Sequence, residues 1–206
     1  MRLRTLAAAL ALVAALVVPL EAHVSQVFYE PTTLEDLASS APVVVVATLA
    51  DPAVRVVEFD WTAARASGEA ATGRYGAGVL QAVVREVLYA APAAGTGPAK
   101  GDTIDILDAD TSETFGLTLS YELEGLSESP IFFRYEGLPL YGPEAAGKEG
   151  IFFLSPPQAH AGSVTLYRSA WEAFDKAFAR AWRLTVGGAV APVSERRKVE
   201  RLLKAR

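Results

Sequence analysis

His23 and His160 are the two imidazoles of the sequence, and His23 lies beside a processing signal. If the chain is cut after Ala22, His23 becomes the mature amino terminus. A terminal histidine offers Cu(II) its α-amine and its imidazole nitrogen, a donor set that copper accepts. His160 is then the second imidazole of the site. A copper site at His23 and His160 is therefore one hypothesis, and an accidental histidine at the cut is the other. We expect no further cofactor.

A group of acidic residues imitates the start of a calcium loop. Asp108, Asp110 and Ser112 match the first, third and fifth positions of an EF-hand. The sixth position is Glu113 instead of glycine, and the twelfth is Leu119 instead of glutamate. We therefore expect solvated loop carboxylates here.

The compact motifs of nucleotide and hydrolase chemistry are missing from the sequence. It has no complete Gly-x-x-x-x-Gly-Lys-Ser/Thr loop and no Gly-x-Ser-x-Gly elbow, and Gly76-x-Gly78 lacks a third glycine. Glu122 and Glu124 would share the polar face of a strand, where an exposed pair is expected. The sequence favours a non-catalytic protein with no catalytic residues.

Composition limits the partners and the redox chemistry. The 206 residues carry a net charge of −5, include 51% hydrophobic residues and contain no cysteine. An acidic chain is a poor match for nucleic-acid phosphates, so we expect no nucleic-acid partner. Disulfides and thiolate metal sites are excluded. The length suits one main domain with a small appendage.

The N-terminal segment has the pattern of a secretory signal peptide. Arg2 and Arg4 precede an uncharged apolar stretch at residues 6–20. As a helix this stretch would rise about 22 Å, which is short of a hydrocarbon core of roughly 30 Å. We predict cleavage after Ala22 and an exported protein, periplasmic or extracellular, with no membrane span after cleavage.

The first half of the remaining chain predicts one short helix and three strands. Thr33 and Asp36 fit a capping box for a helix at residues 34–40. Residues 43–49 are mostly β-branched and predict a strand buried on both faces. Residues 60–78 show no clear period and suggest a long excursion. Strands are expected at residues 79–89 and 103–108.

The middle of the chain alternates apolar and polar residues. Residues 117–124 show this alternation most clearly and predict a half-buried strand. Residues 131–135 and 150–154 predict short strands bounded by proline and glycine, and Val164 and Leu166 mark another.

The period then changes to that of helices. Trp171, Phe174, Phe178 and Trp182 fall at spacings of three, four and four, and predict one aromatic stripe that packs into the core. Residues 184–193 suggest a hairpin around two glycines. Ser194 is expected to cap a final basic helix.

Three segments in a fixed order support a family resemblance. They are residues 33–37 leading into 41–48, Val83-Val84-Arg85-Glu86-Val87-Leu88, and Gly147-Lys148-Glu149-Gly150-Ile151-Phe152-Phe153-Leu154. The pattern resembles a family of secreted bacterial β-barrel proteins of unassigned function. It is also similar to the netrin-like OB barrel of the tissue inhibitors of metalloproteinases. The resemblance covers roughly residues 33–193 and rests on hydrophobic patterns.

The resemblance implies architecture rather than mechanism. Those inhibitors bind protease zinc through an amino-terminal cysteine and carry disulfides, neither of which this cysteine-free chain has. It implies a mainly β fold with flanking helices (α+β): an OB-like five-stranded barrel with an aromatic-striped helix and a C-terminal helix. The expected domains are a signal peptide at 1–22, the OB-like β-barrel domain at 23–193 and the basic helix at 194–206.

Three classes of function remain. The first is a secreted or periplasmic non-catalytic interaction module that binds an unknown protein or envelope component. The alternative is a periplasmic copper-binding protein or copper enzyme that uses its N-terminal histidine. The third is a carbohydrate-binding module of the OB type, with exposed aromatic side chains such as Trp61 or Tyr75.

Overall fold

The computed structural model describes residues 28–206 except 96, 127–128, 142 and 163–165. The predicted signal peptide, its cleavage site and His23 lie outside the described residues. Within the described part of the chain, no helix combines the length and the apolar character needed to cross a membrane.

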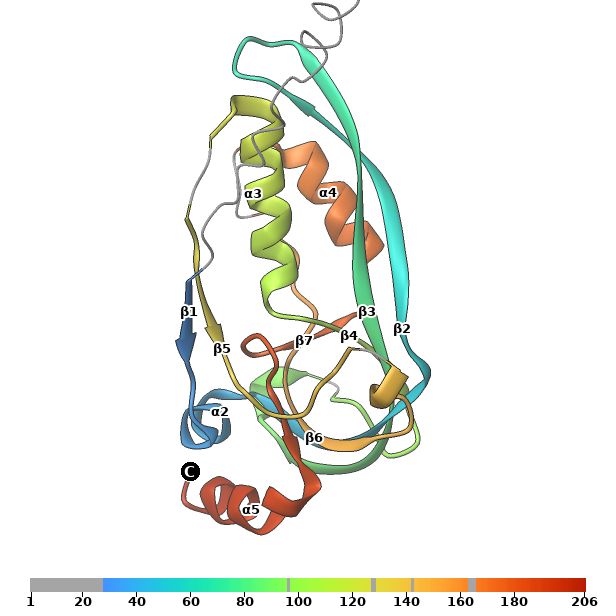
Figure 1. Ribbon diagram of the computed structural model, residues 1–206, viewed down its shortest axis with the longest axis vertical. Coiled ribbons are helices and arrows are strands. Elements are labelled where there is room, and N and C mark those ends of the chain that lie inside the picture. The colour runs from blue at the N-terminus through green and yellow to red at the C-terminus, as the bar shows by residue number, and fades with distance from the viewer. Residues whose placement is uncertain (1–27, 96, 127–128, 142, 163–165) are drawn as a thin grey trace, which may run out of the picture.

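The structure is mainly β with flanking helices, as predicted (Figure 1). The strands are β1 (Phe28–Pro31), β2 (Val43–Ala64), β3 (Ala70–Ala90), β4 (Thr103–Leu107), β5 (Ile131–Arg134), β6 (Glu149–Ser155), β7 (Trp182–Leu184) and β8 (Val190–Pro192). The helices are α2 (Leu34–Ser40), α3 (Asp110–Glu124), α4 (Arg168–Ala177) and α5 (Arg196–Lys204), with short 3-10 turns η1 (Pro92–Ala94), η2 (Pro143–Ala145) and η3 (Val193–Glu195).

Helix α2 has the predicted bounds and the predicted cap. The Asp36 backbone N–H donates to Thr33 Oγ1 over 3.2 Å, and the Thr33 backbone N–H donates to Asp36 Oδ2 over 3.1 Å. The two residues thereby satisfy each other's free backbone donors at the helix start. The strand predicted to follow is also confirmed, since residues 43–47 are fully buried between their neighbours and the helices.

The excursion predicted at residues 60–78 is wrong, because these residues form the far half of a long β-hairpin. Strands β2 and β3 pair antiparallel out to Ala64 and Ala70. Trp61 and Ala63 face inward while Asp60 and Thr62 face solvent, so a period of two is present. The glycines of β3 obscure this pattern on the partner strand. Gly73 has a specific role, because a Cβ there would lie 2.6 Å from Cε2 of Trp61.

The strands of the larger sheet pair in a continuous sequence. Antiparallel pairings join β2 to β3 and β3 to β4, and a parallel pairing joins β4 to β7. Strand β7 then pairs antiparallel with β6, and β6 pairs antiparallel with β2. Strand β8 adds to β6, and β1 and β5 form a separate parallel pair. The hairpin predicted at residues 184–193 is wrong, because β7 and β8 each pair with β6.

The strand predicted at residues 117–124 is also wrong, because they belong to helix α3. Phe115, Leu119 and Leu123 are buried at a spacing of four, which is the helical period. Leu119 and Leu123 also fit the alternation of a strand, so these residues match both the helical and the strand period. Gly125 ends the helix with a φ of 69°, the left-handed conformation that glycine adopts readily.

The aromatic stripe is helical over only part of its predicted length. Helix α4 ends at Ala177, Phe178 forms its C-cap and Trp182 begins β7. Phe174 and Phe178 are buried, as predicted for a core stripe. Val164 lies outside the described residues, and Leu166 is an exposed turn residue rather than part of a strand. The predicted Ser194 cap is also wrong, because Glu195 occupies the N-cap of α5 without a side-chain bond.

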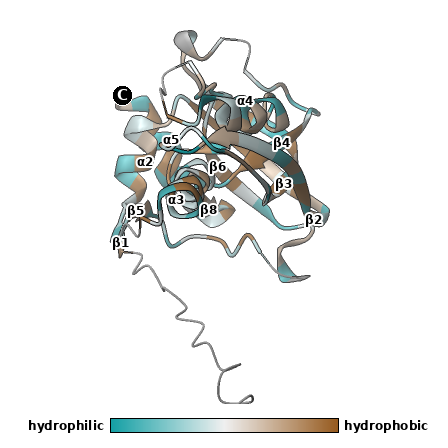
Figure 2. Cartoon of the chain, turned by 90° about the horizontal axis from the view of Figure 1, so that it is seen from above, coloured by the Kyte–Doolittle hydropathy of each residue, from teal (hydrophilic) through white to brown (hydrophobic). Residues whose placement is uncertain are grey.

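Two hydrophobic clusters divide the interior. The first fills the sheet around β2 and β6 and extends to α2 and α5, with Val45, Leu80 and Phe152 fully buried. The second lies between the far half of the β2–β3 hairpin and helices α3 and α4, and contains Trp61, Phe115 and Phe174. Figure 2 shows the hydrophobic segments gathered inside the chain when it is seen from above. Helix α3 begins shortly after β4, and the polar residues of its first turn are half-buried or exposed.

Candidate functional site

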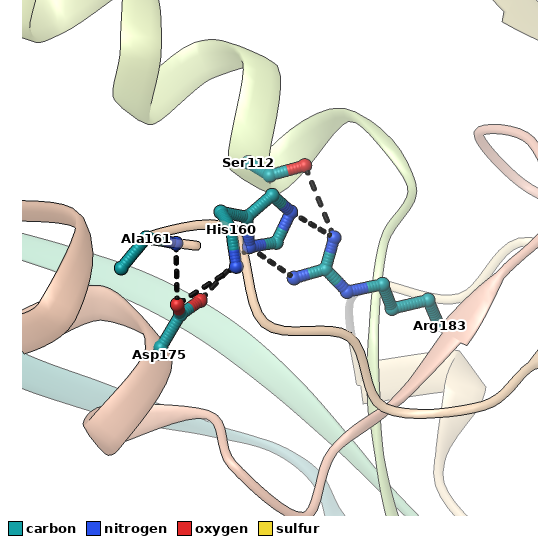
Figure 3. A network of polar contacts seen from close by, with 5 residues as sticks. All are labelled: Ser112, His160, Ala161, Asp175 and Arg183. Atoms are coloured by element: carbon teal, nitrogen blue, oxygen red, sulfur yellow. Dashed lines mark hydrogen bonds and ion pairs between the residues drawn. The ribbon is translucent and has the colours of Figure 1, made fainter. Parts of the chain in front are cut away.

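His160 lies in the loop after β6 and is held by Asp175 of helix α4 (Figure 3). Its Nδ1 is 2.9 Å from Asp175 Oδ1. The other carboxylate oxygen, Oδ2, accepts the backbone N–H groups of His160 and Ala161 over 2.7 and 2.8 Å. One aspartate therefore fixes both the ring and the backbone of this loop.

Arg183 of strand β7 lies close to both ring nitrogens of the imidazole, with its Nη2 3.4 Å from Nδ1. Its Nη1 lies 2.8 Å from His160 Nε2 and 3.3 Å from Ser112 Oγ in the first turn of α3. Asp175 accepts a hydrogen bond from Nδ1–H, and the guanidinium donates a hydrogen bond to Nε2, so we assign the tautomer that carries its proton on Nδ1. The imidazole stacks on Trp171 at a centroid distance of 5.1 Å.

Arg183 is itself a buried side chain, with 9% of its surface exposed. Burial lowers the pKa of its guanidinium, and the charge of Asp175 acts in the opposite direction. Its Nε is buried without a hydrogen-bond partner. The cluster of Ser112, His160, Asp175 and Arg183 thus joins α3, the β6–α4 loop, α4 and β7.

The cluster does not have the arrangement of a serine–histidine–aspartate triad. A triad needs the free imidazole nitrogen to accept the serine proton. Here that nitrogen accepts from Arg183, which also binds Ser112. Copper would likewise have to displace Arg183 or Asp175 from His160. The copper site at His23 and His160 stays a prediction. Among the described residues, no group of three or more His, Cys, Asp or Glu side chains is arranged around a metal position.

A second polar site is a pocket at the beginning of α3. A pocket of about 250 Å³ is lined by Tyr75, Asp108, Asp110 and Tyr141, together with Ala77, Gly78, Thr111 and Thr114. Tyr141 donates its hydroxyl to Asp108 Oδ2 over 3.1 Å, and Tyr75 donates to the Thr111 carbonyl over 3.3 Å. We call this pocket the acidic cleft.

Asp108 has one carboxylate oxygen that the protein does not use. Its Oδ1 is buried and has no hydrogen-bond partner, while Oδ2 accepts from Tyr141. A buried carboxylate oxygen without a donor is costly, because it has lost water without gaining a replacement. The same residue lines the acidic cleft.

The electrostatics of the acidic cleft are unusual for aspartates. Burial raises the pKa of Asp110 to about 6, with further contributions from the negative charges of Asp108 and Glu113, while Arg134 acts in the opposite direction. Burial and the charge of Asp108 also raise the pKa of Tyr141. Burial raises the pKa of Tyr75 to about 12. The phenols stay neutral at physiological pH, and Asp110 loses its proton around pH 6.

Arg134 lines an adjoining hollow that shares Tyr141 with the acidic cleft. This second hollow has a volume of about 430 Å³ and is lined by Arg134, Gly188 and residues 135–141. The guanidinium lies over the Tyr29 ring at 5.5 Å from its centroid. Gly187 lies close to Asp110, because a Cβ there would lie 2.9 Å from Asp110 Oδ2. The acidic cleft and this second hollow, which contains both Arg134 and Glu136, therefore meet at Tyr141.

The structure places several of the candidate site residues differently from what the sequence predicted. Asp108 and Asp110 are half-buried and line a pocket, rather than being fully solvated. Glu122 and Glu124 lie on a helix instead of a strand face, and Glu124 accepts a hydrogen bond from Tyr167. Of the two aromatic residues considered exposed, Trp61 is buried, because it packs across Gly73, and Tyr75 is half-buried in the acidic cleft.

Several residues of both sites were not anticipated. Asp175 follows Trp171 by four positions and so lies near the aromatic face of α4, which is a signal that the sequence does contain. Arg183, Arg134 and Tyr141 carry no comparable signal, because each reaches its site through a long-range contact.

The sequence matches no protein-family model and no curated protein.

Proposed function

We propose that the chain is an exported, non-catalytic binding module that takes a small polar ligand into the acidic cleft. The observation that carries the proposal is the unpartnered, buried Oδ1 of Asp108 at the wall of a pocket. A concave site with a few convergent polar groups and a carboxyl of perturbed pKa is the usual form of a ligand site. The ligand supplies the hydrogen-bond donor that Asp108 lacks.

We also propose that the larger sheet is a small barrel of the OB kind. The ring of pairings β2–β3–β4–β7–β6–β2 supports this proposal, since it returns to the strand where it began. The parallel contact between β4 and β7 and the position of α3 between β4 and β6 agree with it. Tyr75 on β3 and Asp108 after β4 place the acidic cleft against neighbouring strands, and OB folds commonly bind ligands on such a surface.

Binding without catalysis is supported by the state of the histidine cluster. The Nε2 atom of His160 is engaged by Arg183, so it is not poised to activate Ser112. A hydroxyl nucleophile needs an adjacent free base. The histidine cluster therefore acts as a structural link that holds the first turn of α3, and with it the acidic cleft.

Ligand screening by NMR tests the binding proposal directly. Nitrogen-15-labelled protein is titrated with separate pools of polyamines, free amino acids and neutral sugars. We expect at least one pool to shift amides of residues 108–114 and 137–141. Asp108→Ala should weaken that binding by about tenfold or more, which is the value of one charged hydrogen bond.

Asp60→Ala is the matched control, because Asp60 is an exposed aspartate on the hairpin, paired with Arg74. It should leave the affinity unchanged. Shifts confined to the exposed outer residues of β1 and β5, or no shifts at all, would overturn the acidic cleft as the binding site. Mass spectrometry of exported protein tests the localisation: a chain that begins at His23 supports it, and an intact Met1 contradicts it.

A further inference from the structure

We propose that the ligand of the acidic cleft is a small zwitterion, a free amino acid, with its ammonium group at Asp108 and Asp110 and its carboxylate at Arg134. This inference rests on the proposed function and specifies its ligand class. The inference is carried by the acidic cleft and by the guanidinium of Arg134, which lines, together with Glu136, the hollow on the other side of Tyr141.

The acidic cleft has the hydrogen-bond acceptors that an ammonium group requires. An ammonium group carries three N–H donors and no acceptor. Asp108 Oδ1 is buried and without a partner, and the Asp110 carboxylate lines the same pocket. The Asp110 carboxylate is crowded by the charges of Asp108 and Glu113, so a bound cation would reduce their mutual repulsion.

The neighbouring hollow has a guanidinium that suits a carboxylate. Among the described residues, no carboxylate lies within ion-pair distance of Arg134, whose guanidinium instead lies over the Tyr29 ring. Guanidinium groups bind carboxylates through two parallel hydrogen bonds. A Cβ on Gly187 would lie 2.9 Å from Asp110 Oδ2, and a Cβ on Gly188 would lie 3.8 Å from Arg134 Nε, so the two charges lie beside consecutive residues of one turn.

Simpler ligands satisfy only part of this arrangement. A plain amine would pair with the aspartates and meet the repulsive charge of Arg134. A plain carboxylate would pair with Arg134 and meet the two aspartates. A neutral sugar would relieve neither charge. The ammonium and carboxylate of an α-amino acid, held one carbon apart, match a site in which opposite charges are close neighbours.

Isothermal titration with chemically blocked ligands tests the assignment. The probes are the common L-amino acids, the amides of those that bind, their N-acetyl derivatives, and tripeptides with the same central residue. We expect the amide and the N-acetyl form each to bind at least about tenfold more weakly than the amino acid. The tripeptide, whose charges are farther apart, should also bind more weakly. Equal or tighter tripeptide binding would identify a peptide terminus as the ligand and overturn the free amino acid.

Two variants test separately how the protein recognises the carboxylate and the ammonium group of the ligand. Arg134→Gln should bind the amino acid and its amide with similar affinity, because the carboxylate has lost its partner. Asp110→Asn should bind the amino acid and its N-acetyl form with similar affinity. The matched controls Arg74→Gln and Asp60→Asn, an exposed pair on the hairpin, should keep the original preference. Circular dichroism confirms that each variant is folded.

The outcomes separate this inference from the proposal beneath it. If polyamines or sugars shift the acidic cleft as strongly as amino acids do, the module binds there and the zwitterion assignment is wrong. If no probe binds, both are wrong. If amino acids bind and both variants still prefer the amino acid to its amide and N-acetyl forms, the charges of Arg134 and Asp110 do not recognise the ligand, and the inference fails.

Discussion

Asp175 binds His160 through both of its carboxylate oxygens. Oδ1 lies 2.9 Å from the ring Nδ1, and Oδ2 accepts the backbone N–H of the same residue over 2.7 Å. This double contact fixes the orientation of the imidazole and the path of its loop. It also presents Nε2 to Arg183, which in turn contacts Ser112 at the start of α3.

Asp175→Ala should therefore lower the free energy of unfolding by about 3 kcal/mol, because it removes the acceptor of several charged hydrogen bonds in a largely buried setting. Urea denaturation followed by circular dichroism measures the change. Glu172→Ala is the control on the same helix, since the Glu172 side chain is 60% exposed and pairs with Arg168. A loss equal to that of the control would mean that the loop is held by other contacts.

Phe178→Ala should cost about 3–5 kcal/mol, because Phe178 is 5% exposed and packs edge-on against Phe59 at 5.8 Å. Chemical denaturation is again the measurement. Phe133→Ala makes the same chemical change at a side chain that is 52% exposed, and should change stability by no more than about 0.5 kcal/mol. Similar effects at the two positions would contradict the second hydrophobic cluster.

Gly73→Ala should destabilise the far half of the hairpin by about 2 kcal/mol, because a new Cβ would overlap the buried Trp61 ring. The clash should also move the tryptophan fluorescence of the folded state. Gly76→Ala provides the comparison on the same strand, because its Cβ would lie at an ordinary 3.4 Å from Glu58 Cγ. A neutral result at Gly73 would show that Trp61 can move aside without loss.

Asp110→Asn should stabilise the protein at high pH. The pKa of about 6 in the folded protein lies above the ordinary value of 3.8, so the folded state binds more protons between these values. The free energy of unfolding of the unmodified protein therefore falls as pH rises through this window, and the loss is complete above the folded pKa. At pH 8 the variant should be more stable by about 1 kcal/mol, a figure reduced for the half-exposed position.

The difference between Asp110→Asn and the unmodified protein should vanish toward pH 4, where Asp110 is neutral in the folded state. Thermal or urea denaturation at a series of pH values follows this trend. Asp60→Asn, at a carboxyl group that is 76% exposed, should show no such trend. A gain that is constant across the series would have a cause other than the charge of Asp110.

The sequence by itself determined the elements whose signals are local. The capping pair Thr33 and Asp36 specified helix α2, because their hydrogen bonds span three residues. The β-branched run at residues 43–49 specified a buried strand, since any such run must hide both of its faces. The helical spacing from Trp171 to Phe178 specified a buried aromatic face.

Tertiary structure decided the elements whose patterns fit two periods. Leu119 and Leu123 suit a strand by alternation and a helix by their spacing of four, and packing of α3 beneath the hairpin selected the helix. Tertiary structure likewise decided the end of the stripe. Trp182 follows the helical spacing, yet its backbone pairs with Ile106 in the sheet.

The sites themselves were decided only by the fold. Asp108 and Tyr141 are separated by 33 residues, and Ser112 and Arg183 by 71. Such pairs leave no local period or spacing in the sequence. The residues come together only when the sheet forms, because the chain between them can adopt many conformations before that. The raised pKa of Asp110 has the same origin, since burial and neighbouring charges act only once the chain has folded.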